Sequence, residues 1–315
     1  MRTIRQILPL AIAMAALLVV FGLWVPNFIS AENMLDLVQQ VSVNAILAFG
    51  MTLVILIGGI DLSVGALVAL VGTTTVYVLS RGPSDGQNLW WLAAAVLCGL
   101  GLGAGFGAFN GLCAAKTKMP PFIITLAMML VARGAALRFN EGRPMHIPDQ
   151  QTIFLSLGNG RLFGVVPVPV VVMLGLFAVV AILLHRTRFG QHLYAIGGNR
   201  EAARFTGISI VRNEISVYLI CSVLAGLAGM IHTSQLYSAE PASGVMFELN
   251  AIAAAVVGGT SFTGGRGTMY GTLIGAIIIG ILDKGLNQAG VHFSLQYIVK
   301  GAVILTAVYM DVRRR

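Results

Sequence analysis

The sequence predicts an all-α protein that crosses a lipid bilayer about ten times. Hydrophobic residues make up 57% of the 315 residues, charged residues make up only 10%, and the mean hydropathy is +0.86. A soluble domain carries roughly 25% charged residues, so this chain lacks the polar surface that water would require. Backbone polar groups in lipid must be paired within the chain, and the apolar runs do not alternate as barrel strands do. The spans are therefore expected to be helices.

Ten apolar segments approach the ~20 residues that a membrane helix needs. They cover residues 7–28, 41–58, 62–79, 90–113, 121–137, 165–184, 215–236, 251–263, 269–282 and 293–310. We expect eight to ten membrane helices in a single membrane domain that comprises residues 1–315.

The positions of the charges predict the orientation of these helices. The net charge of +8 sits in short stretches between apolar runs, which indicates membrane topology rather than nucleic-acid binding. Arginines precede the first segment and follow the last one, so both termini are expected in the cytoplasm. The loop over residues 185–213 carries five arginines against Glu201 and is expected to be cytoplasmic. The loop over residues 138–161 must then be external, although it also carries three arginines.

Glycines recur every four residues in the fourth segment, at Gly99, Gly103, Gly107 and Gly111. This spacing places them on one side of a helix, where the bare backbone lets a neighbouring helix approach closely. Tight helix packing is the expected role, and lining of a pore is the alternative.

Two stretches of the chain resemble each other. Asn44-Ala45-Ile46 before Gly58-Gly59 is similar to Asn250-Ala251-Ile252 before Gly258-Gly259. Duplicated halves are common in transporters, with the substrate site near their interface. The similarity suggests an internal pseudo-repeat.

The run from Gly58 to Gly65 carries a carboxylate inside a long apolar stretch. A charge at membrane depth costs about 2.5–3.5 kcal/mol on insertion scales, so such a residue usually faces a cavity or a partner. Gly58 and Gly59 would interrupt a helix there, and Asp61 with Ser63 could cap the helix that follows. Asp61 is thus expected either to act as an N-cap at this break or in a short cytoplasmic turn, or to line a translocation path.

A second motif lies in the cytoplasmic loop. Asn199 is a good N-cap, Glu201 suits the positive end of a helix dipole, and Gly207 is a good C-terminal stop. The helix so defined has about two turns, which is marginal in water without a partner. It is expected to dock on another protein, or to lie on the membrane with Phe205 and Ile208 inserted.

Glu201-Ala202-Ala203 followed by Gly207 resembles the EAA-type coupling loop of ABC importer permeases. Five further motifs, in order, are similar to the ribose-type sugar permeases of the branched-chain amino acid/ribose-type permease family. They are GMTLVIL at 50–56, GIDLSVG at 59–65, PFIITL at 121–126, YAIGGN at 194–199 and VGGTS at 257–261. The resemblance runs from about residue 33 to residue 311.

The resemblance implies the ABC importer permease fold and a role for particular residues. The segment 199–208 would be the coupling helix that fits a groove on the ATPase subunit, with Glu201 and the adjacent arginines as polar contacts. Its residues would be Asn199, Arg200, Glu201, Ala202, Ala203, Arg204, Phe205 and Gly207. Residues near the central translocation path would be Asp61, Ser63, Thr125, Asn250 and Ser261.

The resemblance also implies the function and the partners. The chain would be the transmembrane subunit of a bacterial inner-membrane importer that moves a neutral monosaccharide, of the ribose type or a related one, into the cytoplasm. Its partners would be ABC ATPase subunits, a second permease subunit that is identical or paralogous, a periplasmic sugar-binding protein and membrane lipids. The external loop over residues 139–161, with Arg143 and Arg161, would dock the binding protein.

No motif for nucleotide chemistry occurs in the chain. Gly259 and Gly264 have the spacing of a phosphate-binding loop, but Gly265-Arg266 follows where Lys and Ser or Thr are needed. We therefore expect no cofactor, metal or catalytic residue here, and no enzyme activity, since ATP and magnesium would bind to the partner ATPase. Lys300 lies within the last segment, where it is expected either to snorkel or to pair with another polar group, for which Asp283 is a candidate. The alternative function is an ion-coupled secondary transporter that uses Asp61.

Overall fold

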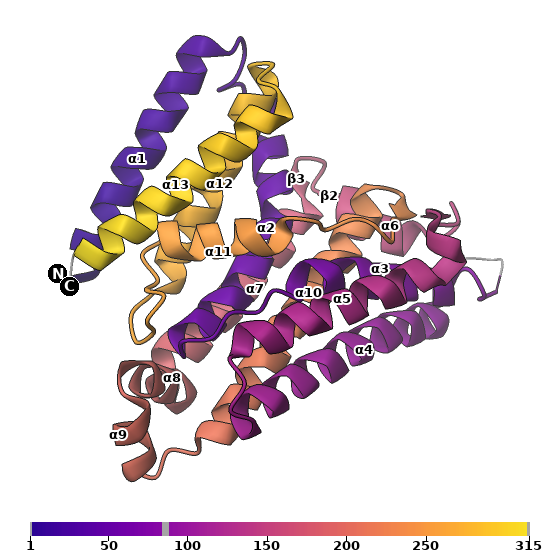
Figure 1. Ribbon diagram of the computed structural model, residues 1–315. Coiled ribbons are helices and arrows are strands. Elements are labelled where there is room, and N and C mark those ends of the chain that lie inside the picture. Colours follow the sequence, from indigo (N-terminus) through magenta and orange to yellow (C-terminus); the bar gives the residue numbers. More distant parts are fainter. Residues whose placement is uncertain (1, 84–87, 314–315) are drawn as a thin grey trace.

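The computed structural model describes residues 2–83 and 88–313, and it is built almost entirely of helices (Figure 1). The all-α prediction is confirmed. Ten helices correspond to the ten predicted segments: α1 (Arg2–Trp24), α2 (Ala31–Leu56), α3 (Val64–Leu79), α4 (Leu89–Lys116), α5 (Pro121–Arg138), α7 (Val168–Arg186), α10 (Ile210–Gln235), α11 (Phe247–Val257), α12 (Met269–Gln288) and α13 (Phe293–Arg313). Among the described residues, six of these are long and apolar enough to cross a membrane, and four are shorter apolar helices.

Several predicted boundaries differ from the observed helix ends, and two of these differences have a clear cause. Helix α2 begins ten residues earlier than expected, at Ala31, because polar residues in its first turns conceal the helix from a hydropathy search. Ser30 caps this start by accepting a hydrogen bond from the Asn33 N–H at 3.3 Å. Helix α11 ends at Val257, since Gly259 adopts a φ of 91°, and residues 258–263 form a loop.

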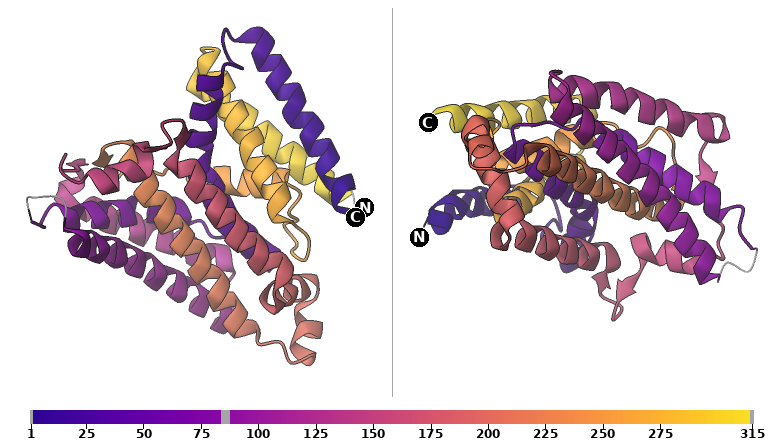
Figure 2. Two further views of the ribbon diagram at one scale, coloured as in Figure 1. Left: turned by 180° about the vertical axis from the view of Figure 1, so that it is seen from behind. Right: turned by 90° about the horizontal axis from the view of Figure 1, so that it is seen from below.

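Short elements that hydropathy does not detect occupy the connections. One group comprises η1 (Phe139–Gly142), α6 (Thr152–Asn159) and two small antiparallel sheets, which pair β1 (Met145–His146) with β4 (Ser238–Ala239) and β2 (Arg161–Leu162) with β3 (Val166–Pro167). The other group is α8 (Arg188–Gly198) and α9 (Arg200–Phe205), at the opposite end of the molecule from α6 (Figure 1). The start of α1 and the end of α13 lie at the same edge of the molecule (Figure 2).

Helix α2 forms the centre of the core, and nearly all of its residues from Val41 onward are buried. Helix α4 packs against α10 through the predicted glycines. A Cβ added at Gly107 would come within 2.6 Å of the Tyr218 carbonyl oxygen, and one at Gly111 within 2.6 Å of the Ile215 Cα. The packing role of these glycines is confirmed, because the backbones approach too closely for any side chain between them.

Both helix breaks have the same turn. The Gly58 N–H donates to the Ile55 carbonyl and the Gly59 N–H to the Val54 carbonyl, while Gly58 has a φ of 80°. At the second break the N–H groups of Gly259 and Thr260 donate to the carbonyls three and five residues earlier. These are Schellman C-caps, which end a helix with a left-handed residue. Gly58 therefore corresponds to Gly259, one residue later than the sequence similarity suggested.

Candidate functional site

Helix α9 has the predicted caps at both ends. The Asn199 Oδ1 atom accepts a hydrogen bond from the Ala202 N–H at 3.0 Å. At the other end the Gly207 N–H donates to the Arg204 carbonyl at 3.1 Å, and the Ile208 N–H to the Ala203 carbonyl at 3.2 Å. Gly207 has a φ of 83°, which completes a Schellman cap. The helix covers six residues, since the last part of the segment 199–208 forms this cap.

Most of the α9 side chains face away from the rest of the chain. Phe205 is 86% exposed, and Glu201, Ala202 and Arg204 are exposed as well. Ala203 is only 4% exposed and forms the inward side of the helix. An exposed aromatic ring beside exposed charges, on a short capped helix, is a surface suited to a protein partner.

Arg200 anchors α9 to the start of α10. Its Nη2 atom donates to the Glu214 Oε2 atom at 3.0 Å, and its Nη1 atom donates to the Oε1 atom. Glu214 is 3% exposed, so its carboxylate needs this partner. The hydrogen bonds that Arg200 donates to Glu214 raise the pKa of Arg200 above its usual value. Sequence analysis missed Glu214, although it is a lone carboxylate at the head of an apolar run.

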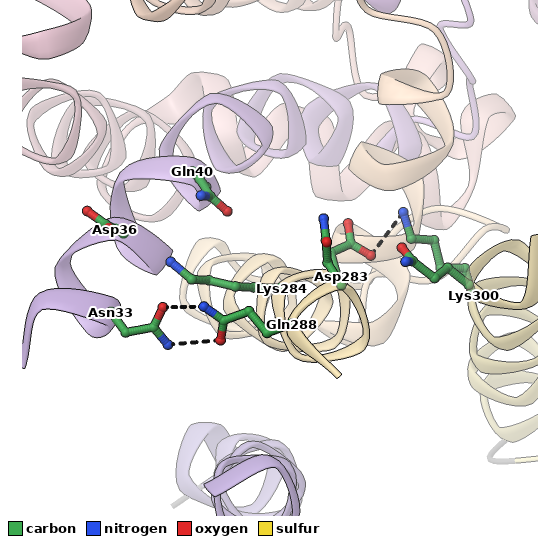
Figure 3. Close-up of a pocket in the computed structure, with 9 residues that line it drawn as sticks. Asn33, Asp36, Gln40, Asp283, Lys284, Gln288 and Lys300 are labelled. Carbon is green, nitrogen blue, oxygen red and sulfur yellow. Dashed lines mark hydrogen bonds and ion pairs between the residues drawn. The ribbon is translucent and has the colours of Figure 1, made fainter. Parts of the chain in front are cut away.

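A polar cavity of about 520 Å³ lies between α2, α12 and α13 (Figure 3). Its lining is made of amide and charged side chains: Asn33, Asp36, Gln40, Asp283, Lys284, Asn287, Gln288, Gln296 and Lys300. None of the α2 residues in this lining falls in a predicted membrane segment. Asn33, Asp36 and Gln40 recur at helical spacing on one face, and this pattern could have indicated that the helix begins earlier.

Two pairs of lining residues join neighbouring helices (Figure 3). Lys300 Nζ lies 2.9 Å from Asp283 Oδ1, which confirms the pair predicted from the sequence. Asn33 and Gln288 exchange two hydrogen bonds, of 2.7 and 3.3 Å, between their side-chain amides. Such groups donate and accept hydrogen bonds in several directions, which is what a hydroxyl-rich neutral solute needs.

A second cavity, of about 250 Å³, adjoins the first, because Gln40 and Asp283 line both. It is smaller and more apolar, lies between α2, α10, α11 and α12, and has Asn44, His232, Gln235 and Asn250 as further polar groups. The His232 ring packs edge-on against the Phe247 ring at 5.1 Å. Both cavities lie along α2, and we refer to the two together as the polar route.

The other predicted path residues lie at the helix breaks. Asp61 and Ser63 are fully buried, and the Asp61 Oδ1 atom accepts from the Ser63 N–H at 2.9 Å and from the Ser63 hydroxyl at 2.6 Å. Thr125 joins this group, since its Oγ1 atom accepts from the Leu62 N–H at 3.1 Å. Asp61 stands two residues before Ser63, the N-cap of α3, and so orders the turn into that helix. Ser261 is buried in the second break, and only Asn250 of the five lines either cavity.

Comparisons with known proteins give a consistent result. Residues 33–308 match the family described as branched-chain amino acid transport system/permease component. The Ribose import permease protein RbsC of Escherichia coli is 44% identical over 306 residues, which cover 96% of this chain and 93% of that protein. The protein of the same name in Bacillus subtilis is 43% identical over 298 residues, covering 95% and 90%. The D-allose transport system permease protein AlsC of Escherichia coli is 36% identical over 299 residues, covering 95% and 89%. No solved structure matches the chain.

Proposed function

Because this chain belongs to the branched-chain amino acid transport system/permease component family, we propose that it carries a neutral monosaccharide of the ribose type across the bacterial inner membrane. It is the transmembrane subunit of a sugar ABC importer and not an enzyme. The observation that carries the choice of substrate is the identity of 44% to a ribose permease over nearly the whole length. Identity falls to 36% for the D-allose permease and to 34% for an L-arabinose permease.

The energy for transport would enter through α9. ATP and magnesium would bind to separate ATPase subunits, and the exposed residues of the segment 199–208 would fit a groove on such a subunit. The exposure of Phe205 and Glu201 supports this role, as does the anchoring of Arg200 to the buried Glu214. A force applied to α9 would pass to α10 through this ion pair.

The sugar would pass through the polar cavities along α2. The amides of the lining suit an uncharged polyol, since each can replace a hydrogen bond that the sugar makes to water. Two of the charged residues in the lining, Asp283 and Lys300, are paired with each other, so they need not attract an ion. Asp61, Ser63, Thr125 and Ser261 would shape this path from the helix breaks, and Asn250 would line it.

The remaining partners follow from this function. Two permease subunits, identical or paralogous, would pair in the membrane, with both termini and α9 in the cytoplasm. A periplasmic sugar-binding protein would dock on the opposite face, where Arg143 is exposed in the loop over residues 139–161. Arg161 in this loop lies 3.9 Å from Asp36, at the mouth of the larger cavity.

Reconstitution tests the proposal directly. The permease would be purified with its ATPase and binding-protein partners, placed in liposomes, and assayed for uptake of ribose, D-allose and L-arabinose. We expect ATP-dependent uptake with ribose preferred. Uptake driven by an ion gradient alone, without the ATPase, would instead establish the secondary transporter that uses Asp61, for which the relatives give no support.

Glu201→Ala tests the role of the coupling helix. We expect the variant to insert in the membrane normally, because Glu201 is exposed and supports no packing. ATP hydrolysis by the complex should no longer drive uptake, or should lose its stimulation by the binding protein. The measurement is sugar transported per ATP hydrolysed, and full coupled uptake by this variant would refute the role of Glu201.

A further inference from the structure

Three segments that are distant in the sequence meet through bare backbone next to the coupling helix. They are the end of α8 at Gly197, the end of α2 at Leu56, and the loop of the second helix break at Gly264 and Gly265. The Gly265 N–H donates to the Leu56 carbonyl at 2.9 Å. A Cβ added at Gly197 would overlap both the Leu56 carbonyl oxygen and the Gly265 nitrogen. We name these four residues the glycine junction.

The conformation of the loop fits this close contact. Gly264 and Gly265 have φ values of 83° and 71°, which residues with a Cβ rarely adopt. A Cβ at Gly264 would lie 3.0 Å from the Gly197 carbonyl oxygen and 2.8 Å from the Leu56 carbonyl oxygen. Three glycines are thus required where the three segments touch.

A side chain fixes the same loop a short distance away. The Tyr194 hydroxyl of α8 donates a hydrogen bond to the Gly267 carbonyl at 2.7 Å. Partial burial raises the pKa of Tyr194 to about 12, so the hydroxyl keeps its proton and remains a donor at physiological pH. Helix α8 therefore holds the second break at two points, Gly197 and Tyr194.

We propose that the glycine junction transmits motion of the coupling helix to both helix breaks at once, with Gly197 as the positioning residue. Only Gly198 and Asn199 separate Gly197 from α9. Backbone groups in direct contact cannot absorb a displacement by changing rotamer, as long side chains can. A shift of α8 and α9 would therefore move the end of α2 and the loop over residues 258–268 together. Asp61 and Ser63 follow the first break, and Ser261 lies within the second.

The inference rests on the proposed function, in which α9 receives force from an ATPase. The alternative explanation is ordinary packing, in which the glycines only stabilise the fold. A packing role predicts that uptake and ATP hydrolysis fall together as stability falls. Transmission predicts that uptake per ATP falls while ATPase binding and hydrolysis persist.

The chain offers a matched pair of variants. Gly197→Ala places a methyl group against the Leu56 carbonyl, whereas a Cβ at the adjacent Gly198 would meet nothing within 4 Å. In liposomes that contain the full complex, Gly197→Ala should lower sugar uptake per ATP by about 2- to 30-fold. Gly198→Ala should behave as the natural protein does. Equal values for the two variants would overturn the inference.

Tyr194→Phe decides the question if Gly197→Ala fails to fold. This variant keeps the ring and removes only the hydrogen bond to Gly267, so it should fold and bind the ATPase. Loss of one hydrogen bond should lower uptake per ATP by about 2- to 12-fold, with ATP hydrolysis retained. An unchanged ratio, or a parallel loss of both activities, would reject transmission through the junction. Absence of ATP-driven uptake in the natural protein would instead reject the proposed function.

Discussion

At the scale of single residues, Glu214 determines how α9, the proposed coupling helix, is held. A helix of six residues is unstable by itself, and α9 keeps its place through two caps and one ion pair. The Glu214 carboxylate is 3% exposed, whereas about half of the Arg200 side chain remains in contact with solvent. Arg200 therefore pairs with the buried carboxylate and also holds α9 in place. This arrangement leaves Glu201 and Arg204 available to a partner.

Replacement of Arg200 tests this anchor. Arg200→Met should lower the free energy of unfolding by about 1–3 kcal/mol, because Glu214 is left buried without its charged donor. Arg204→Met is the matched control, since Arg204 lies on the exposed side of the same helix. Thermal unfolding in detergent compares the two variants. Equal melting temperatures would show that the ion pair does not stabilise the fold.

At the scale of elements, hydropathy predicted the membrane helices. It failed for the polar start of α2 and for the short helices in the connections. The start of α2 carries the polar residues of the larger cavity, so its first ten residues read as a loop. Helices α6 and α8 are short and lie in connections, where their apolar faces are too small to detect. The caps at Asn199 and Gly207 were predictable because they depend on neighbours in sequence. The Glu214 pair and the glycine junction were not, because they join residues that only the fold brings together.

The packing of α4 on α10 gives a prediction at the same scale. Gly107→Ala should destabilise the protein by about 1–3 kcal/mol, because the methyl group would overlap the backbone of Tyr218 and Leu219. Gly105→Ala should be neutral or slightly stabilising, since a Cβ there meets nothing within 4 Å and alanine favours helix. The comparison uses thermal unfolding of the two variants in the same detergent. A larger loss for Gly105→Ala would contradict this packing.

At the scale of the whole molecule, α2 connects the two functional regions. Its first turns line the larger cavity, its middle carries Asn44 in the smaller one, and its last residue, Leu56, lies in the glycine junction. Motion at the cytoplasmic end would therefore be felt along the polar route through a single rigid helix. In the proposed mechanism, this arrangement would let a chain with no nucleotide-binding motif couple transport to ATP hydrolysis on another subunit.

Gln40 is the residue at which this connection can be tested, because it lines both cavities. Gln40→Leu would remove an amide from the residues that both cavities share and should lower sugar uptake by about 2- to 12-fold, the value of one hydrogen bond. Stimulation of ATP hydrolysis by the binding protein should persist, because the coupling helix is untouched. Gln39→Leu is the control, since the Gln39 amide donates to the Gly158 carbonyl at 2.9 Å and lines neither cavity. Equal loss of uptake in both variants would trace the effect to the stability of α2, and the polar route would then not be the path of the sugar.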